Sequence, residues 1–378
     1  MKKKKICFIV SSPFTAKVFL LNHFKILADD FDIYLVANFE NFDIKMFADI
    51  PLKDVKNINI QRNINILKDI KALFLLRKYL KEMQFDAVQT VTPKAGLVGI
   101  LAARLARVNK RIHIFTGQVW YTKKSVFKSL LKFLDKIIVW SATDILVDGE
   151  SQRQFLIKNN IVKENNSYVL GKGSISGVDT NRFIPSEAIK NEVRDELGIK
   201  QNEIVYMFLG RMNIDKGIRE LAEAFNKLQL NNPNVRLLLV GGDEENMTSV
   251  IKQKIKNIKS VIFYGVTPTP ERLLQACDVF CLPSYREGFG TSVIEASLLA
   301  KPIICSDTYG LMETIIENKT GLRHRVRDVA SLYAQMRKLV NDKEYRVQLG
   351  KGGREYVLEN FSANAISAKW FKFYKQKV

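Results

Sequence analysis

The stretch LPSYREGFGTSVIE, residues 282–295, determines the expected fold of the second half of this chain. It starts at the end of an apolar run at 278–282, passes through Gly288 and Gly290, and enters a helix-forming run at 291–300. This order predicts a strand, a glycine-containing loop and a helix. In that arrangement the backbone N–H groups of the helix N-terminus point outward and can bind phosphate.

Two carboxylates flank this predicted turn: Glu287 lies in the loop, and Glu295 lies about one turn into the helix. A carboxylate repels phosphate but accepts hydrogen bonds from sugar hydroxyls, whereas Thr291 and Ser292 in the first turn can donate to phosphate. The stretch therefore indicates a nucleotide-sugar, with phosphate in the middle and sugar at both ends. A capped helix with two solvated glutamates has the same spacing.

Two basic residues follow the end of another predicted strand. The apolar run at 204–209 leads into Gly210 and Arg211, and Lys216 follows five positions later. Arginine offers a fork of donors and lysine a point charge, so the two can converge on one diphosphate. Two ordinary surface cations are the alternative interpretation.

Strand and helix candidates alternate along the whole chain, which is typical of an α/β protein with parallel sheets. Helices are expected, for example, at 67–83 and 96–107. The expected strands are 5–10, 32–37, 86–91, 111–115 and 144–147 in the first half, and 204–209, 235–240, 260–264, 278–282 and 302–305 in the second.

The chain has 378 residues, enough for two Rossmann-like domains. We expect the first domain at 1–170 and the second at 171–361, because three glycines crowd together at 171–177. The last residues, 362–378, are basic and aromatic and should form a separate helix.

Charge and cysteine content restrict the class of protein. The chain has 59 Lys and Arg against 39 Asp and Glu, a net charge of +20, which implies an anionic partner such as nucleic acid, acidic lipid or a phosphorylated substrate. No two cysteines have the CxxC spacing of a zinc site. The apolar runs around the cysteines suggest buried, reduced thiols in a cytoplasmic protein. No run approaches the ~18 apolar residues of a membrane span. The cysteines are Cys7, Cys277, Cys281 and Cys305.

The pattern E-G-F-G-x-x-x-x-E after a strand ending in L-P-S resembles the signature of family 4, the retaining glycosyltransferases with the GT-B fold. Gly210 to Gly217 is similar to the G-R-x-x-x-x-K-G motif of that family. The segment at 177–185 resembles its interdomain segment, and 263–266 resembles its segment near the nucleotide base. The resemblance is dense over 171–328 and thin before it.

The resemblance implies two Rossmann-like domains whose parallel sheets face each other across a cleft, and a last helix that crosses back to the first domain. It implies catalytic roles for Glu287, Arg211 and Lys216. It also implies a set of donor-binding residues: Gly210, Arg211, Lys216, Val266, Glu287, Gly288, Phe289, Gly290, Thr291, Ser292 and Glu295.

The resemblance further implies transfer with retention of configuration. Arg211, Lys216 and the helix N-terminus at Thr291 can stabilise the leaving phosphate, so we expect that no metal is required. The donor is then the only small molecule needed, and among donors we favour a UDP-sugar. Asp30-Phe-Asp32 has the form of an Asp-x-Asp metal motif, but it precedes a strand, where such charges are usually solvated.

The first half departs from the common family pattern. Thr116 and Gly117 stand where many members carry histidine, as in the branch of bacterial capsule and O-antigen transferases. With Phe14 and Thr15 after the first strand, they are the candidates for the acceptor side. His113 alternates into a strand and should be structural. For His23 both a structural role and a place in the acceptor site are open.

A basic helix is expected at 121–136. Three lysines recur every four residues on one side, Lys124, Lys128 and Lys132, and four apolar residues share another, Phe127, Leu130, Leu131 and Leu134. This pattern is typical of a helix on an anionic membrane, although a solvated face of an ordinary helix looks the same. We expect a cytoplasmic protein bound peripherally to the inner face of the plasma membrane.

The favoured function is therefore transfer of a sugar from a nucleotide-sugar to a glycan or polyprenyl-linked acceptor in surface polysaccharide biosynthesis. A GT-B-type UDP-sugar 2-epimerase is the main alternative, because it binds the same kind of ligand. A nucleic-acid-binding protein would explain the charge but not the loop with two carboxylates, and no nucleic-acid-binding motif is visible, so we expect no nucleic acid partner.

Overall fold

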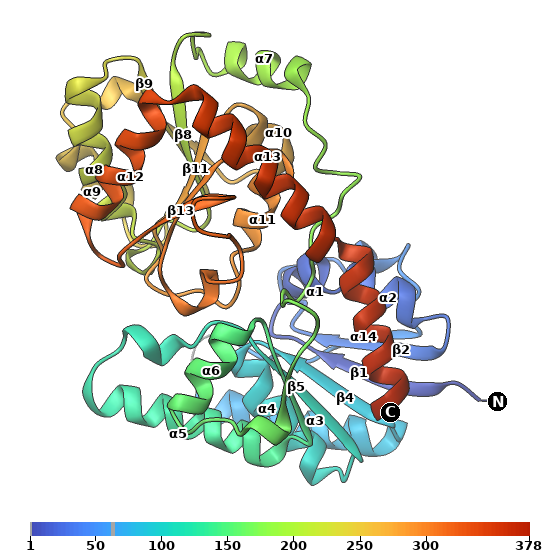
Figure 1. Cartoon of the computed structure of the whole chain (residues 1–378). Coiled ribbons are helices and arrows are strands. Elements are labelled where there is room, and N and C mark those ends of the chain that lie inside the picture. Colours follow the sequence, from blue (N-terminus) through green and yellow to red (C-terminus); the bar gives the residue numbers. More distant parts are fainter. Residues whose placement is uncertain (1, 62–64) are drawn as a thin grey trace. The chain divides into compact units, whose positions relative to one another are not determined.

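A computed structural model of the chain describes residues 2–61 and 65–378. The chain divides into two compact units, drawn in Figure 1. Unit 1 contains Met1–Gly177 and Ala363–Val378, and unit 2 contains Val178–Ser362.

The division lies after Gly177, whereas the sequence suggested a boundary after residue 170. The glycine-containing segment in between packs within unit 1. The N–H of Ser174 donates to the carbonyl of Asp148 at 2.7 Å. A Cβ on Gly173 would lie 2.3 Å from the same carbonyl oxygen, so only glycine allows this close approach.

Within its described residues, unit 1 has a seven-stranded parallel sheet in the order β3-β2-β1-β4-β5-β6-β7. The strands are β1 (Lys4–Ile9), β2 (Phe31–Ala37), β3 (Asp54–Asn57), β4 (Ala87–Val91), β5 (Lys110–Phe115), β6 (Asp144–Val147) and β7 (Ser167–Val169). The α-helices are α1 (Pro13–Phe19), α2 (Leu21–Leu27), α3 (Ile66–Met83), α4 (Pro93–Leu105), α5 (Ser125–Ser141), α6 (Glu150–Lys158) and α14 (Ala363–Lys377).

Both faces of this sheet are covered, which explains the continuous apolar run in β1. Successive strand residues point to opposite faces. Ile6 and Phe8 join a core with α2 and α14, whereas Cys7 and Ile9 join a core with α3 and α4. Strands buried on both sides read as uninterrupted hydrophobic runs, as parallel sheets generally do.

The last helix, α14, completes the core of unit 1. The ring of Trp370 stacks on His23 of α2 with centroids 4.1 Å apart, and Ser367 Oγ lies 2.8 Å from His23 Nδ1. The hydroxyl of Tyr374 donates to Gln89 Oε1 of β4 at 2.8 Å. These contacts tie the end of the chain to α2 and to the sheet.

Unit 2 has a six-stranded parallel sheet in the order β10-β9-β8-β11-β12-β13. Its strands are β8 (Ile204–Leu209), β9 (Val235–Val240), β10 (Val261–Gly265), β11 (Val279–Leu282), β12 (Ile303–Ser306) and β13 (Gly321–His324). Its α-helices are α7 (Glu187–Glu196), α8 (Ile218–Asn231), α9 (Met247–Lys254), α10 (Pro270–Gln275), α11 (Thr291–Leu298), α12 (Val329–Asn341) and α13 (Lys343–Asn360).

The strand order of unit 2 brings its two conspicuous loops together. Strands β8 and β11 are neighbours, with Tyr206 opposite Val279 and Met207 opposite Phe280. Because the strands are parallel, the loops that follow them leave the same carboxyl edge of the sheet, where α/β proteins usually bind their ligands. The loop bearing Arg211 and the loop bearing Glu287 are therefore adjacent.

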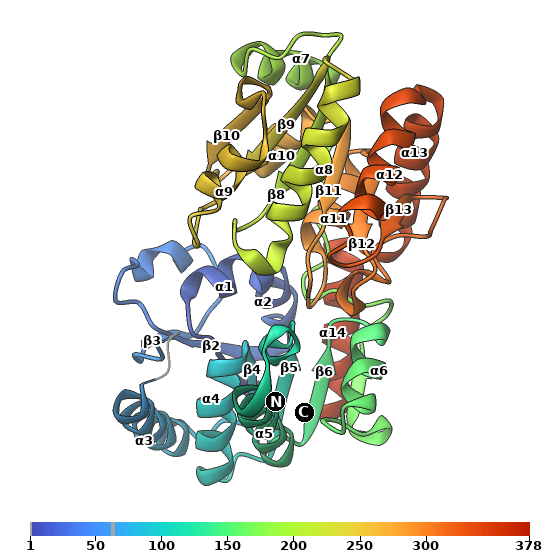
Figure 2. The same cartoon turned by 90° about the vertical axis from the view of Figure 1, so that its left-hand side faces the viewer.

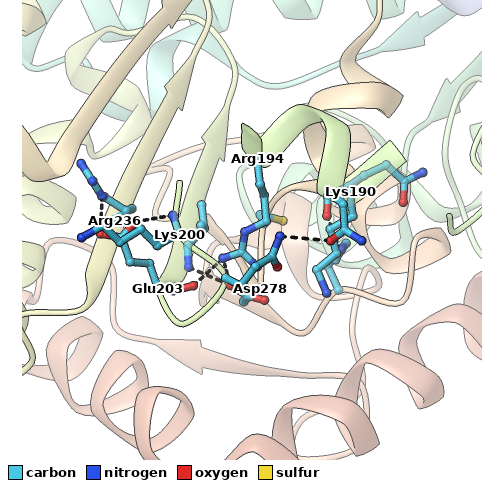
Figure 3. A network of polar contacts seen from close by, with 12 residues as sticks. Lys190, Arg194, Lys200, Glu203, Arg236 and Asp278 are labelled. Atoms are coloured by element: carbon cyan, nitrogen blue, oxygen red, sulfur yellow. Dashed lines mark hydrogen bonds and ion pairs between the residues drawn. The ribbon is translucent and has the colours of Figure 1, made fainter. Parts of the chain in front are cut away.

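The opposite, amino edge of the same sheet is held by a polar network, shown in Figure 3. Arg194 of α7 donates to Asp278 Oδ2 at 3.3 Å, and the same oxygen accepts from the N–H of Val205 at 2.9 Å. Arg236 donates to Glu203 Oε1 at 2.8 Å. The network joins the starts of β8, β9 and β11 to α7, so it supports the fold away from the loops at the carboxyl edge.

The predicted α/β class with two parallel-sheet, Rossmann-like domains is thus confirmed. Over the described ranges, none of the helices combines the length and the hydrophobicity needed to cross a membrane.

Candidate functional site

The carboxyl edge of the unit 2 sheet collects the residues that the sequence singled out as a donor site. Arg211 and Lys216 follow β8, Val266 follows β10, and the loop with Glu287 follows β11 and leads into α11. Strand ends that are remote in the sequence therefore meet at one edge.

Two glycines allow the loops of this edge to pack backbone against backbone. Gly217 has φ +68°, and a Cβ there would lie 2.1 Å from the carbonyl oxygen of Pro283. A Cβ on Gly310 would lie 2.3 Å from the carbonyl oxygen of Glu287. Larger residues at either position would push the lysine loop or the glutamate loop out of place.

Lys216 and Glu287 form an ion pair, with Lys216 Nζ 2.5 Å from Glu287 Oε1. Their side chains are only 18% and 12% exposed, so the pair is screened from solvent on most sides. Next to it, Arg286 bonds Asp215 at 2.8 Å, and the N–H of Tyr285 donates to the carbonyl of Asp215 at 2.7 Å. These contacts fix the lysine loop against the glutamate loop.

Arg211 has a different partner. Its Nη1 lies 3.0 and 2.9 Å from the two carboxylate oxygens of Glu244, and Asn213 Nδ2 donates to the same carboxylate at 3.1 Å. Arg211 and Lys216 thus bond two separate carboxylates. We did not anticipate Glu244 from the sequence, although the acidic run after β9 was a visible signal.

Glu295 is half-buried on α11, and burial raises the pKa of its carboxyl to about 7. Arg182 opposes this shift and Glu271 adds to it. A carboxylate that is poorly hydrated gains more from accepting hydrogen bonds from a ligand's hydroxyls than one that is already solvated.

The N-terminus of α11 starts at Gly290, which has no side chain, and no side-chain hydrogen bond caps this end in the described structure. Thr291 and Ser292 are half-buried in its first turn. Phe289, which the sequence placed among the donor-binding residues, packs its ring on Phe361 with centroids 5.3 Å apart, so only its backbone can face a ligand.

The other predicted donor-site residues lie at the same edge. Gly210 directly follows β8, and Gly288 lies in the loop before α11. Val266 is 78% exposed just beyond β10. An exposed apolar side chain in this place can contact a flat ring such as a nucleotide base.

The acceptor-side candidates lie at the carboxyl edge of the unit 1 sheet. Phe14 is exposed in the first turn of α1, after β1, and Thr15 follows it. Thr116 and Gly117 follow β5, and the carbonyl of Thr116 accepts from Gln152 Nε2 at 2.6 Å. Strand β4 separates β1 from β5, so these residues form two groups.

Thr92 lies between these two groups, because it directly follows β4, and we did not identify it from the sequence. It follows β4 with φ +76°, which is uncommon for a β-branched residue. Its Oγ1 lies 3.3 Å from Ser11 Oγ in the loop after β1. Backbone strain of this kind is found mainly at functional sites, but only a structure reveals it.

The two histidines of unit 1 are core residues. His113 is buried, with Nδ1 2.8 Å from Thr90 Oγ1, and burial lowers its pKa to about 3. His23 is also fully buried, and burial lowers its pKa to about 4. The suggestion that His23 lines the acceptor site is therefore wrong, because α14 covers it.

The basic helix differs in detail from its prediction. Helix α5 starts at Ser125, preceded by a 3₁₀ turn, Val119–Thr122. Leu131 and Leu134 were expected on the exposed apolar side but are half-buried against the unit. The large apolar side chains that α5 exposes are Val126, Phe127, Leu130, Phe133 and Trp140.

The residues suspected of metal or thiol chemistry have ordinary surroundings. Asp30 bonds Lys375 at 2.8 Å, and Asp32 lies 3.6 Å from Lys53. In the part of the chain that the structure describes, no three or more His, Cys, Asp or Glu side chains gather as a metal site would require. The four cysteines are free and buried, as predicted.

Comparisons with known proteins agree with this arrangement. The family described as "Glycosyl transferases group 1" matches residues 189–356, and "Glycosyl transferase 4-like" matches residues 5–148. The capsular polysaccharide biosynthesis glycosyltransferase CapM of Staphylococcus aureus is 29% identical over 343 residues, covering 89% of this chain and 87% of CapM.

A second relative is the N,N'-diacetylbacillosaminyl-diphospho-undecaprenol α-1,3-N-acetylgalactosaminyltransferase of Campylobacter jejuni, 28% identical over 92% of each chain. Among solved structures, Anabaena HepE in complex with UDP-glucose superposes with a TM-score of 0.81, covering 99% of this chain and all of HepE, at 19% identity. That similarity concerns the fold.

Each unit thus matches a glycosyltransferase family, and the relatives extend over both. The chain is therefore a glycosyltransferase with the GT-B fold, and each of its halves resembles a glycosyltransferase family model.

Proposed function

We propose that this glycosyltransferase moves a sugar from a UDP-sugar to a lipid-linked or oligosaccharide acceptor in surface polysaccharide biosynthesis, with retention of configuration and without a metal. The observation that carries the proposal is the Lys216–Glu287 ion pair beside the uncapped N-terminus of α11. It combines a phosphate-binding cation, a hydroxyl-accepting carboxylate and outward-pointing N–H groups at one place.

Each group of this edge takes one part of the donor. Lys216, Arg211 and the N-terminus of α11 bind the diphosphate, which displaces Arg211 from Glu244. Glu287 accepts hydrogen bonds from the transferred sugar, and Glu295 accepts them from the ribose. Glu287 thus exchanges part of its bond to Lys216 for bonds to the sugar.

The reaction breaks the bond between the anomeric carbon and the diphosphate oxygen. The acceptor oxygen forms its bond on the same face of the sugar, and its proton passes to the leaving phosphate. Negative charge builds on that phosphate, where Lys216 and Arg211 stabilise it. One such preorganised donor typically lowers the reaction barrier by about 3–4 kcal/mol, so the protein's own cations can take the place of a metal.

The names of similar proteins support the donor and acceptor classes. HepE has been crystallised with UDP, and with UDP-glucose. The Campylobacter jejuni relative is named for a diphospho-undecaprenol acceptor, and an Escherichia coli relative, 28% identical over 90% of this chain, for UDP-galactose and GlcNAc-diphosphoundecaprenol. We therefore expect a sugar on a polyprenyl diphosphate as the acceptor.

Such an acceptor lies in a membrane, and α5 is suited to reach it. Its exposed apolar residues include Phe127 and Leu130. Lys123 and Lys124 are exposed just before its first residue, and Lys136 is exposed in its second half. An amphipathic helix of this composition binds the headgroup region of an anionic bilayer. We place the enzyme at the cytoplasmic face of the plasma membrane, held there peripherally.

The test is transfer by the purified protein from a panel of UDP-sugars to undecaprenyl-diphosphate-linked sugars, with and without EDTA. Mass spectrometry identifies the product, and the anomeric coupling constant in NMR shows retention. Lys216→Ala should lower kcat/KM by about 10²–10³, whereas Lys338→Ala, an exposed lysine of α12, should leave it unchanged.

Two outcomes would contradict the proposal. Dependence on added Mg²⁺ or an inverted anomeric configuration would overturn the mechanism. Conversion of the UDP-sugar to an isomer in the absence of any acceptor would identify an epimerase instead.

A further inference from the structure

Helix α3 exposes a second cluster of large apolar side chains. Leu67 is 82% exposed, and Ile66, Ile70, Phe74 and Leu75 are exposed as well. All five lie in the first ten residues of the helix, whereas its second half exposes Arg77, Lys78, Lys81 and Glu82. The buried side of α3, with Leu76 and Leu80, packs on the sheet, so the exposed cluster plays no part in the core of unit 1.

The position of α3 relates this cluster to α5. Helices α3, α4 and α5 lie side by side on one face of the unit 1 sheet, with α4 in the middle, as Figure 2 shows. Each connects two parallel strands, so all three begin near the carboxyl edge of the sheet. The exposed apolar residues of α5 start at Val126, also in its first turns. Both clusters therefore lie near the same edge of one helical layer.

The charge around the α3 cluster is positive. Lys68 and Lys71 are exposed among its apolar residues. The one carboxylate in this half of α3, Asp69, is half-buried and bonds Lys94 of α4 at 2.5 Å. An apolar cluster flanked by exposed lysines matches the boundary between anionic headgroups and acyl chains.

We propose that the first half of α3 is a second membrane-contacting element, which enters the headgroup region of an anionic bilayer beside α5. The inference rests on the proposed function, which places the acceptor in a membrane. Two separate helices hold unit 1 in a fixed orientation, which one helix alone cannot do. The carboxyl edge of its sheet, with Phe14 and Thr116, then lies close to the bilayer surface where the acceptor's diphosphate is found.

The direct test is a fluorescent probe on α3. The four native cysteines are buried, so a surface cysteine introduced as Leu67→Cys can be labelled with an environment-sensitive dye. With vesicles of phosphatidylglycerol and phosphatidylcholine, we expect a blue shift and protection from an aqueous quencher. A matched label at Val347→Cys, an exposed apolar position on α13 in unit 2, should show neither. A label at position 67 that stays in water while one at Phe127→Cys enters the bilayer overturns the inference.

Variants provide a second test. Leu67→Ser with Phe74→Ser should weaken vesicle binding at least about tenfold, and Lys68→Gln with Lys71→Gln about fivefold for each charge. The control, Leu230→Ser with Val347→Ser, removes equally exposed residues of unit 2 and should bind as before. Transfer to a short-chain, water-soluble acceptor should be the same in all of them.

The outcomes separate this inference from the proposed function. If the α3 variants bind vesicles like the unmodified protein while α5 variants do not, the inference fails and the proposed function stands. If the α3 variants change the oligomeric state in light scattering and not vesicle binding, the cluster is a subunit interface and the inference fails. Absence of transfer even to the soluble acceptor, in the unmodified protein, contradicts the proposed function itself.

Discussion

At the level of single residues, the pairing of Lys216 with Glu287 explains how two opposite charges can lie together in the proposed donor site. Each is mostly buried and compensates the other, which avoids the cost of an isolated buried charge. A donor with both a phosphate and hydroxyls offers each of them a new partner. A ligand with phosphate alone would leave Glu287 without compensation, which favours a sugar diphosphate over inorganic phosphate.

Glu295 leads to a prediction about pH. Burial raises the pKa of its carboxyl in the folded protein to about 7, above its ordinary value of 4.5. The folded state then binds the proton more tightly than the unfolded state, so the free energy of unfolding falls as pH rises from about 4.5 to about 7. Glu295→Gln should remove this loss and be more stable than the unmodified protein at pH 8, by on the order of 2 kcal/mol.

Calorimetry at pH 5 and pH 8 measures this difference, and Glu359→Gln, on α13, serves as the control. An equal effect of Glu295→Gln at both pH values would refute the prediction. The proposed role of Glu295 predicts the opposite pH dependence for donor binding. If the ionised carboxylate accepts hydrogen bonds from the ribose, affinity should rise through pH 7 in the unmodified protein and stay flat in the variant.

At the scale of elements, apolar strands were the easiest to predict. Strands such as β8 and β9 lie where the sequence placed them, because a strand buried on both faces is a visible apolar run. Strands β3, β7 and β13, with the sequences DVKN, SYV and GLRH, were not predicted. They are short and polar, and pairing with a neighbour rather than their own composition makes them strands.

Helices were predicted well in position but less well in orientation. Leu131 and Leu134 of α5 follow the helical period as closely as Val126 and Phe133 do, yet only the second pair is exposed. The period shows that a helix has an apolar side, but which side packs on the domain depends on its neighbours. For the same reason the exposed cluster on α3 was not recognised before the structure.

The amino-edge network yields a prediction for α7. Arg194 is 3% exposed and holds Asp278 and the start of β8, far along the strands from the donor loops. Arg194→Met should destabilise unit 2 by about 3 kcal/mol, because Asp278 loses its charged partner. The donor KM should not change. A chemical denaturation series measures the loss, with Arg337→Met on α12 as the exposed control, and a changed KM with unchanged stability would contradict this assignment.

At the scale of the whole molecule, the two units differ in how much their sequence disclosed. Unit 2 carries its proposed donor-binding residues in contiguous loops, so motifs such as 210–217 and 287–295 could be recognised directly. In unit 1 the candidates follow different strands, and Thr92 joins Phe14 and Thr116 only through the order of the sheet. The acceptor site therefore could not be assembled from the sequence.

Much of the positive charge behind the net charge of +20 lies in two regions of the chain. Lysines surround the exposed apolar residues of α3 and α5 in unit 1, and Arg211 and Lys216 mark the donor edge in unit 2. The positive charge that suggested nucleic acid as one possibility is thus divided between a proposed membrane surface and a proposed diphosphate site.

We propose that the carboxyl edge of unit 2 binds a nucleoside diphosphate. The decisive measurement is calorimetric stabilisation by UDP, GDP, ADP and dTDP, with EDTA and then with Mg²⁺. A ligand at a hundred times its dissociation constant should add about 2.7 kcal/mol to stability. We predict this effect for UDP with EDTA present, and its loss in Arg211→Ala and Glu295→Ala but not in Lys338→Ala. Equal stabilisation of all the variants, or none by any nucleotide, would contradict the assignment of the donor site.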